Sequence, residues 1–191
     1  MQTVFPIPCI IVAGGKSSRM GSDKALLHFG GTTLTQYQLA RLKGLFSSLH
    51  VSCKTCDKFD FEASYIKDTQ EFTAFSPLVA LYSILIKFDT PVFILSVDTP
   101  FVDEHIFAKL YAALDEKTDV LIARSPFGSH QLCGIYKPRI AEQIKLQIEK
   151  NEHKIRALYE YLCVNFVDFT DDSPFFNMNF ISDYEHAKRL V

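Results

Sequence analysis

Two adjacent glycines and several basic residues follow an apolar run near the start of the chain. Residues 10–13 are apolar without alternation, which predicts a strand buried on both faces. Gly14 and Gly15 come directly after this run, and because they carry no side chain they leave backbone N–H groups free to face an anion. Arg19 and Lys24 add positive charge to the same segment. A loop of this composition is suited to holding a triphosphate.

The spacing of this segment excludes two common phosphate-binding motifs. A Walker A loop requires G-x-x-x-x-G-K-[ST], whereas Gly21 is followed here by S-D-K. Nor do Gly14, Gly15 and Gly21 fit the G-x-G-x-x-G pattern of dinucleotide-binding proteins. Residues 13–24 instead resemble A-G-G-x-S-x-R-M-G-x-D-K, the signature of nucleotidyltransferases that load an NTP onto a phosphorylated acceptor. The alternative interpretation is an ordinary strand-to-helix turn with surface lysines.

Two aspartates follow short runs that predict further strands. Asp98 ends the apolar run 92–97, and Pro100 stops that strand from continuing. Because ligands bind at the carboxyl ends of parallel strands, Asp98 is predicted to offer its oxygens to Mg²⁺. A role as a helix N-cap is the alternative, and Asp103 is better placed for it. Asp68 also ends a strand pattern and is interpreted either as a nucleotide or metal contact or as a turn residue.

Two further pairs of polar residues are candidates for substrate contacts. Asn177 and Asn179 stand two positions apart, so in an extended segment their amides point to the same side and can bind one polar ligand. The competing interpretation is that both asparagines form turns by bonding to their own backbone. His130 and Gln131 precede a strand pattern and are interpreted either as the border of a second substrate site or as surface residues.

Strand and helix patterns alternate along the chain. The alternation predicts an α/β protein with a mostly parallel sheet and helices on both faces, in a single domain over residues 1–191. The predicted strands are 10–13, 49–53, 65–68, 92–97, 120–123, 132–136 and 163–169. The predicted helices are 33–46, 78–88, 103–114, 140–148 and 183–190.

The composition is that of an ordinary globular protein, with 48% hydrophobic and 22% charged residues. A net charge of −2 gives no electrostatic reason to expect a nucleic-acid partner. The uncharged run 72–86 is too short to span a membrane, so no membrane segment is expected. The amino-terminal segment lacks a positive region and is interrupted by Pro6 and Pro8, so we expect no signal peptide and a cytoplasmic location.

The chain contains five cysteines at irregular spacing. An odd number without a secretion signal predicts free thiols. Cys53 and Cys56 form one C-x-x-C pattern, which is found in half of a zinc site or in a redox pair. Because no second pair accompanies them, we expect them to be small buried hydrophobic residues instead.

These residues together resemble the molybdenum cofactor guanylyltransferases, bacterial enzymes that transfer GMP from GTP to the terminal phosphate of molybdopterin and release pyrophosphate. The family motif L-A-G-G-x-S-x-R-M-G-x-D-K corresponds to residues 12–24. The family's C-D-x-P motif corresponds to residues 97–100, and its late F-x-N-x-N motif to residues 175–179. Its carboxylate ahead of a G-P-L segment corresponds to Asp68 ahead of residues 76–78.

The resemblance implies a fold, a set of ligands and a role for each matched residue. The fold is a three-layer α/β/α sandwich of the Rossmann-like nucleotidyltransferase type. The substrates are GTP and molybdopterin, the metal is Mg²⁺, and transient protein partners would belong to cofactor synthesis and delivery. The implied roles are guanine and ribose binding for Val12, Ala13 and Gly14; phosphate binding for Gly15, Arg19 and Lys24; Mg²⁺ binding for Asp98; nucleotide contact for Asp68; and pterin binding for Asn177 and Asn179. The catalytic residues in this scheme are Lys24, Arg19 and Asp98, and Lys24 and Asp98 also bind the nucleotide.

Several positions depart from the family pattern, among them Val79 and Ala80, which replace an Ala-Gly pair. Ser76 replaces the glycine before Pro-Leu, and Lys54 replaces an asparagine at the end of the second strand. A lysine there loses an acceptor for the base, so base specificity is affected more than phosphate chemistry. The alternatives are therefore a molybdopterin cytidylyltransferase, a sugar-phosphate nucleotidyltransferase or a non-catalytic nucleotide-binding protein. The paired Asn177 and Asn179 and the short chain favour guanylyl transfer.

Overall fold

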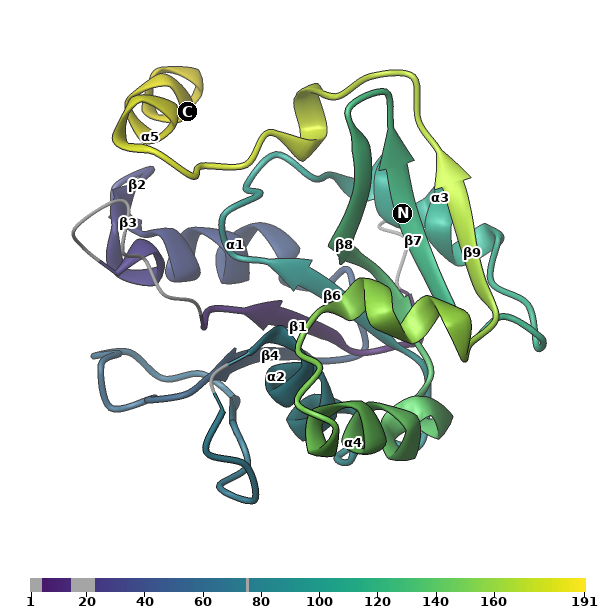
Figure 1. Cartoon of the computed structure of the whole chain (residues 1–191). Helices are drawn as coiled ribbons and strands as arrows, with labels where there is room; N and C mark the ends of the chain where they lie inside the picture. The colour runs from purple at the N-terminus through teal and green to yellow at the C-terminus, as the bar shows by residue number, and fades with distance from the viewer. Residues whose placement is uncertain (1–4, 15–22, 75) are drawn as a thin grey trace.

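A central seven-stranded sheet organises the protein in the computed structural model, which describes residues 5–14, 23–74 and 76–191 (Figure 1). The strand order is β5-β4-β1-β6-β8-β7-β9. The strands of this sheet are β1 (Cys9–Val12), β4 (Leu49–Cys53), β5 (Tyr65–Lys67), β6 (Val92–Ser96), β7 (Val120–Ser125), β8 (Gly128–Tyr136) and β9 (Val164–Asp168). A separate hairpin consists of β2 (His28–Phe29) and β3 (Thr32–Thr33).

The sheet is mostly parallel, as the sequence predicts. β1 pairs in parallel with β4 on one side and with β6 on the other, and β5 pairs in parallel with β4. β8 runs antiparallel to both β6 and β7, whereas β9 returns in parallel with β7. The carboxyl ends of β5, β4, β1 and β6 therefore lie along one edge of the sheet, where ligands bind in folds of this kind.

Helices cover both faces of the sheet and make three layers. The α-helices are α1 (Leu34–Leu42), α2 (Pro77–Leu85), α3 (Glu104–Ala112), α4 (Ala141–Glu149) and α5 (Ile181–Ala187). The 3₁₀ helices are η1 (Lys24–Leu26), η2 (Pro138–Ile140), η3 (Ile155–Glu160), η4 (Ser173–Phe175) and η5 (Lys188–Leu190). Successive residues of β1 point to opposite layers: Cys9 and Ile11 pack with α1 and α3, whereas Ile10 and Val12 pack with α2 and α4. The α/β/α sandwich implied by the sequence is confirmed.

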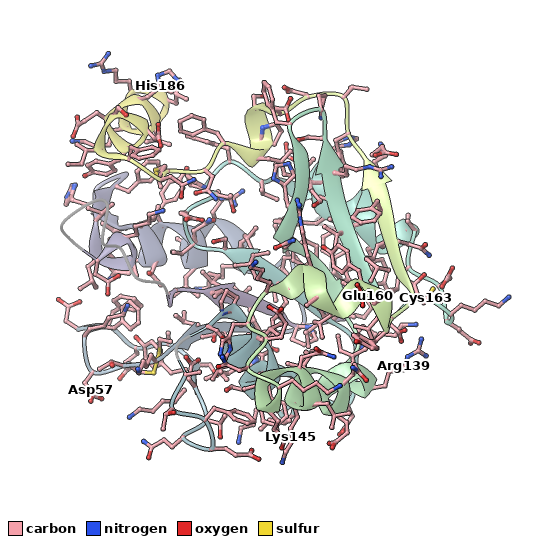
Figure 2. The ribbon with its side chains drawn as sticks, viewed as in Figure 1. Asp57, Arg139, Lys145, Glu160, Cys163 and His186 are labelled. Atoms are coloured by element: carbon pink, nitrogen blue, oxygen red, sulfur yellow. A yellow bond between two sulfur atoms is a disulfide. The ribbon has the colours of Figure 1, made fainter. Side chains whose placement is uncertain are left out.

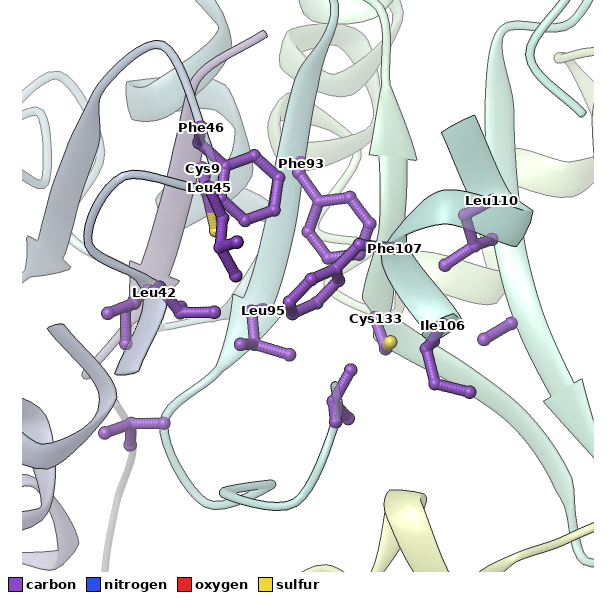
Figure 3. Packing of buried hydrophobic residues seen from close by; sticks show 14 of the residues in the cluster. Cys9, Leu42, Leu45, Phe46, Phe93, Leu95, Ile106, Phe107, Leu110 and Cys133 are labelled. Carbon is purple, nitrogen blue, oxygen red and sulfur yellow. The ribbon is translucent and has the colours of Figure 1, made fainter. Parts of the chain in front are cut away.

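Aromatic rings fill the layer between the sheet and α3. Phe107 of α3 packs edge-on against Phe93 of β6, with ring centroids 4.9 Å apart, and against Phe46 at 5.1 Å (Figure 3). Edge-to-face pairs of this kind add stabilisation beyond the burial of their area. Cys9 and Cys133 lie in the same cluster as fully buried thiols, so burial raises the pKa of each well above its usual value.

The two-stranded hairpin was not expected from the sequence. Gly30 and Gly31 form its two-residue turn, and their φ angles of 56° and 84° are in the left-handed region that favours glycine. The hairpin leads directly into α1, whose N-cap Thr33 forms a capping box with Gln36. The hairpin connects η1, which begins with Lys24, to α1.

The expectation that Cys53 and Cys56 are unpaired thiols is wrong in this structure. Their side chains form a disulfide, with Cα atoms 5.7 Å apart. The turn after β4 brings the two residues together, and the pattern of C-x-x-C spacing alone does not show whether such a turn forms. Cys9, Cys133 and Cys163 are free thiols, as predicted. Among the described residues, no helix is long and apolar enough to cross a membrane.

Candidate nucleotidyl-transfer site

Three side chains from distant parts of the sequence meet at the carboxyl edge of the sheet. The ammonium of Lys24 donates to Asp98 Oδ2 at 2.9 Å and to Asn179 Oδ1 at 3.0 Å. The side chains of Lys24 and Asp98 are only 16% and 15% exposed, so this ion pair is partly shielded from water. Three of the predicted site residues are thus brought together at one point.

Hydrogen bonds to both the side chain and the backbone of Asp98 fix its position. Its Oδ1 accepts a hydrogen bond from the Ser96 hydroxyl at 2.5 Å, and its backbone carbonyl accepts from the Met178 N–H at 3.0 Å. The amide of Gln38 in α1 donates to the carbonyl of Thr99 at 3.2 Å, which holds the turn that follows β6. Asp103, not Asp98, is the N-cap of α3, as predicted. The Asp98 carboxylate is therefore held in place without serving as a helix cap.

Asn177 and Asn179 lie on an irregular segment between η4 and α5. Asp183 at the start of α5 accepts hydrogen bonds from the backbone N–H groups of Asn179 at 3.0 Å and Phe180 at 2.8 Å. This fixes the segment so that the Asn179 amide oxygen reaches Lys24. Asn177 is exposed and lines a neighbouring cavity. The Asn179 N–H also donates to the Asn177 carbonyl at 2.9 Å, so the two asparagines form a turn, while the Asn179 side chain contacts Lys24 and Asn177 lines the cavity.

The end of β1 provides backbone groups beside this centre. Val12 and Ala13 are buried in the sheet, and Gly14 is exposed immediately after them. A side chain at Gly14 would meet the backbone nitrogen of Lys54 at 3.9 Å, an ordinary contact distance. The glycine therefore leaves an open approach to the backbone. Gly15 and Arg19, to which the sequence assigns phosphate binding, lie outside the described residues.

Asp68 follows β5 at the same edge of the sheet. Its backbone N–H donates to the Cys53 carbonyl at 3.1 Å, whereas its buried Oδ1 has no hydrogen-bond partner within the described part of the chain. Burial raises the pKa of this carboxyl above its usual value, and the charge of nearby Lys54 partly offsets the increase. A buried carboxylate oxygen without a partner is costly, so Asp68 is suited to accept hydrogen bonds from a ligand.

Ser76 stands where the family pattern has a glycine, and the backbone at this position accommodates a serine. Its φ of −150° is extended backbone that any residue adopts. The Ser76 hydroxyl accepts from the Val79 N–H at 3.4 Å and caps α2, with Pro77 at the first helical position. The serine thus supplies a helix cap at this position.

A cavity of about 610 Å³ adjoins the meeting point of Lys24 and Asp98. Its polar lining includes Ser96, His130, Gln131, Lys154, Arg156 and Asn177. The His130 ring stacks on Phe175 with centroids 4.2 Å apart, and burial lowers its pKa while Asp172 partly opposes this shift. His130 and Gln131 therefore border a cavity.

The oxygens around Lys24 are of the type that hard cations prefer, and in this structure two of them accept hydrogen bonds from the Lys24 ammonium. Asp98 and Asn179 supply carboxylate and amide oxygens, and the Ser96 hydroxyl lies beside them. Within the described ranges, no group of three or more His, Cys, Asp or Glu residues is arranged to hold a metal. Mg²⁺ commonly uses one or two carboxylates and completes its shell with water and phosphate oxygens, so a single aspartate is sufficient.

Several residues of this site gave no signal in the sequence. Ser96 is one residue of an apolar strand pattern, and Lys154 and Arg156 lie in a polar stretch far from every motif. Lys58 donates to the Ala13 carbonyl at 3.1 Å across 45 positions. A contact between residues so far apart in the sequence depends on the path of the loop between β4 and β5, which local residue patterns do not encode.

The comparisons with known proteins agree with this geometry. The model of the MobA-like NTP transferase domain matches residues 9–165. A protein of Campylobacter jejuni named molybdenum cofactor guanylyltransferase is 43% identical over 181 residues, which cover 94% of each chain. A Helicobacter pylori protein of the same name is 28% identical and covers 97% of this chain and 93% of its own length.

Solved structures share the fold. A crystal structure of molybdopterin-guanine dinucleotide biosynthesis protein A from Archaeoglobus fulgidus superposes with a TM-score of 0.81 and 20% identity, covering 96% of this chain and 98% of that one. A protein from Aquifex aeolicus superposes with a TM-score of 0.76 and 27% identity, covering 91% and 93% of the two chains. With its glycine-bearing segment, its site at the carboxyl edge and these relatives, the chain belongs to the MobA-like NTP transferase family.

Proposed function

We propose that this protein transfers GMP from GTP to the phosphate of molybdopterin and releases pyrophosphate, with residues 1–191 acting as one nucleotidyltransferase domain. The observation that carries the proposal is the meeting of Lys24, Asp98 and Asn179 at the carboxyl edge of the sheet. The 43% identity to a relative named molybdenum cofactor guanylyltransferase supports the choice of substrates.

The nucleotide would lie along the ends of β1, β4 and β5. The Ala13 N–H donates to the Ser52 carbonyl and the Val12 carbonyl accepts from the Val97 N–H, so these two residues would form the floor beneath the nucleotide, and the exposed Gly14 would offer its backbone groups to the base or ribose. Guanine carries two adjacent N–H donors on its base-pairing edge, whereas adenine and cytosine pair one donor with a ring acceptor. The unpartnered Oδ1 of Asp68 accepts such donors. This chemistry favours guanine over the other bases.

The phosphates would lie toward Lys24. Lys24, together with Gly15 and Arg19 from the matched motif, would hold the negative charge of the triphosphate. Asp98 would hold Mg²⁺ with oxygens of the triphosphate, and the metal would offset charge on the phosphates. Asn179 would keep the Lys24 ammonium directed into the site, since its amide oxygen already accepts from that ammonium at 3.0 Å.

The reaction is an in-line displacement. An oxygen of the acceptor phosphate attacks the α-phosphorus of GTP and forms the new P–O bond, while the bond to pyrophosphate breaks and pyrophosphate leaves with its electron pair. Lys24 stabilises the charge that develops on the leaving pyrophosphate. No covalent intermediate with the protein is required, because positioning and electrostatic stabilisation provide most of the catalysis in phosphoryl-type transfers.

The acceptor would occupy the 610 Å³ cavity beside Asp98. Lys154 and Arg156 provide positive charge for a phosphorylated ligand, and His130 with Gln131 provides polar contacts for a pterin. Asn177 lines the same cavity, in keeping with its expected role toward the pterin. Since Ser96 lines the cavity and also contacts Asp98, the acceptor phosphate would reach the reacting phosphorus from this side.

A calorimetric titration with GTP, CTP, ATP and UTP, each with and without Mg²⁺, tests the nucleotide half of the proposal. We expect selective binding of GTP that Mg²⁺ strengthens. Pyrophosphate release on addition of molybdopterin then tests the transfer itself. Preference for CTP would contradict guanylyl transfer, and binding of GTP without pyrophosphate release would contradict the enzymatic proposal.

A further inference from the structure

Lys58 joins the end of β1 to the start of η1. Its ammonium donates to the Ala13 carbonyl at 3.1 Å and to Asp23 Oδ2 at 2.7 Å. The Lys58 side chain is 20% exposed, so it is a partly buried contact and not an extended surface lysine. The two residues it joins precede Gly14 and Lys24 directly in the sequence.

Asp23 connects Lys58 to η1, the 3₁₀ helix that begins with Lys24. One oxygen of its carboxylate accepts from Lys58, and the other accepts from the Ala25 N–H at 3.0 Å as the N-cap of η1. Lys24 is the first residue of η1, and its ammonium reaches Asp98 from there. The position of Lys24 therefore depends on where Lys58 holds Asp23.

The loop that carries Lys58 is itself held rigidly. The Cys53–Cys56 disulfide closes the turn after β4, and Figure 2 shows it beside Asp57. The Lys58 ammonium lies 4.9 Å from the centroid of the Phe59 ring, and that ring stacks on Tyr65 of β5 with centroids 5.4 Å apart. These contacts place the ammonium before any ligand binds, which a positioning role requires.

We infer that Lys58 is a positioning residue that sets the location of Lys24 for the triphosphate. The inference rests on the proposed function, because it assumes that Lys24 meets the outer phosphates of GTP. Lys58 also neutralises the carboxylate of Asp23, which would otherwise repel a triphosphate from the neighbouring residue. The residue acts through Asp23 and does not touch the reacting atoms.

Binding of GTP and GMP to wild-type protein, Lys58→Met and Lys58→Arg tests this role. We expect Lys58→Met to weaken GTP binding about tenfold, the effect of losing one charge-assisted hydrogen bond. GMP binding stays unchanged, because GMP lacks the phosphates that Lys24 meets. Lys58→Arg, which keeps the charge and the donors, restores most of the GTP affinity.

Lys137→Met is the matched control. The Lys137 ammonium likewise contacts two residues, donating to the backbone carbonyls of Asp115 at 2.5 Å and Glu116 at 2.8 Å. Lys137 follows β8 at the opposite edge of the sheet, near Arg139, which Figure 2 shows far from Asp57. We expect this variant to bind GTP as the wild type does.

A double-mutant cycle tests the route through Asp23. We expect Lys58→Met to lose the most GTP affinity, because it also leaves the Asp23 carboxylate without its counter-charge. Asp23→Asn and the double variant should lose the same, smaller factor, because Lys58 has no further effect once the Asp23 charge is removed. Additive losses in the double variant would overturn the route through Asp23. Equal losses for GTP and GMP, or wild-type GTP binding by Lys58→Met, would overturn the positioning role. If the wild-type protein binds no GTP, the proposed function fails, and the inference fails with it.

Discussion

The Lys24 ammonium lies 2.9 Å from Asp98 Oδ2, although 74 positions separate the two residues in the chain. Each belongs to a different motif: Lys24 ends the glycine-bearing segment, and Asp98 follows β6. Because β1 and β6 are adjacent parallel strands, residues that follow them lie at the same edge of the sheet. The pair therefore presents a cation and a carboxylate side by side at this edge, the arrangement on which the proposed function rests.

Replacing Asp98 by asparagine keeps the shape of the side chain and removes its charge. We expect Asp98→Asn to lower the rate of pyrophosphate release by on the order of 10²–10³, because it removes an electrostatic contact in the transition state. Asp103→Ala is the matched control: it removes the N-cap of α3, which costs about 1 kcal/mol of stability, but should leave the rate unchanged. A near-normal rate for Asp98→Asn at saturating Mg²⁺ would contradict the role of Asp98.

Replacing Lys24 by methionine keeps most of the aliphatic stem and removes the charge. We expect Lys24→Met to weaken the binding of GTP by about tenfold or more, since one charge-assisted contact to phosphate is lost. The binding of GMP should change little. Calorimetry with both ligands measures the difference, and an equal loss of affinity for GTP and GMP would place Lys24 elsewhere in the site.

If Asp68 accepts hydrogen bonds from guanine as proposed, nucleotide binding and protein stability should both depend on its ionisation. Its pKa is raised by burial, so the folded state takes up a proton more readily than the unfolded state. The destabilising contribution of this carboxylate is therefore complete above its folded-state pKa and is relieved as the pH falls through that value. GTP binding should follow the opposite trend and weaken over the same pH window, because the ionised carboxylate is the better acceptor for guanine.

The variant Asp68→Asn separates these two effects. We expect it to increase the free energy of unfolding of the ligand-free protein at pH 7 by about 1 kcal/mol, since it removes a partly buried charge whose Oδ1 has no hydrogen-bond partner among the described residues and which Lys54 offsets only in part. The preference for GTP over ATP should fall at the same time. Urea unfolding and competitive nucleotide binding measure the two quantities. A variant that is less stable than the wild type would contradict the assigned environment of Asp68.

The two asparagines should give different kinetic results. Asn177 lines the cavity and does not contact Lys24 in the described structure, so Asn177→Ala should raise the KM for molybdopterin and leave GTP affinity unchanged. Asn179 accepts from the Lys24 ammonium, so Asn179→Ala should weaken GTP binding as well. Steady-state kinetics with each substrate varied in turn resolves the two cases. Identical kinetic profiles for the two variants would refute this division.

The sequence predicted those parts of the protein that depend on local patterns. Asp98 could be identified because an uninterrupted apolar run and Pro100 mark the end of a buried strand. The alternation of strands and helices gave the layers, although β8 begins at Gly128, earlier than the apolar residues indicate. Its first five residues are only half-buried, so they carry no hydrophobic signal, and its antiparallel direction depends on the partner strands.

The parts that could not be predicted depend on loops. Lys58 is one of many lysines in the sequence, and only the folded loop brings it to Ala13 and Asp23. The Cys53–Cys56 disulfide depends on the same turn, because the C-x-x-C spacing is compatible with both paired and free cysteines. Lys154 and Arg156 are part of the cavity only because η3 passes in front of β8.

The contact between Lys24 and Asn179 joins residues 155 positions apart, which has a consequence for how the site forms and fails. A contact that closes such a long loop forms at the entropic cost of bringing the two ends of the intervening chain together. Such contacts therefore tend to form late during folding. Asn179 belongs to a segment held to the sheet by the hydrogen bond from Met178 to Asp98 and by the buried side chains of Met178 and Phe175. Local opening of this segment would separate Asn179 from Lys24 while the seven-stranded sheet stays intact. On heating, the capacity to catalyse transfer should therefore disappear below the temperature at which the protein unfolds.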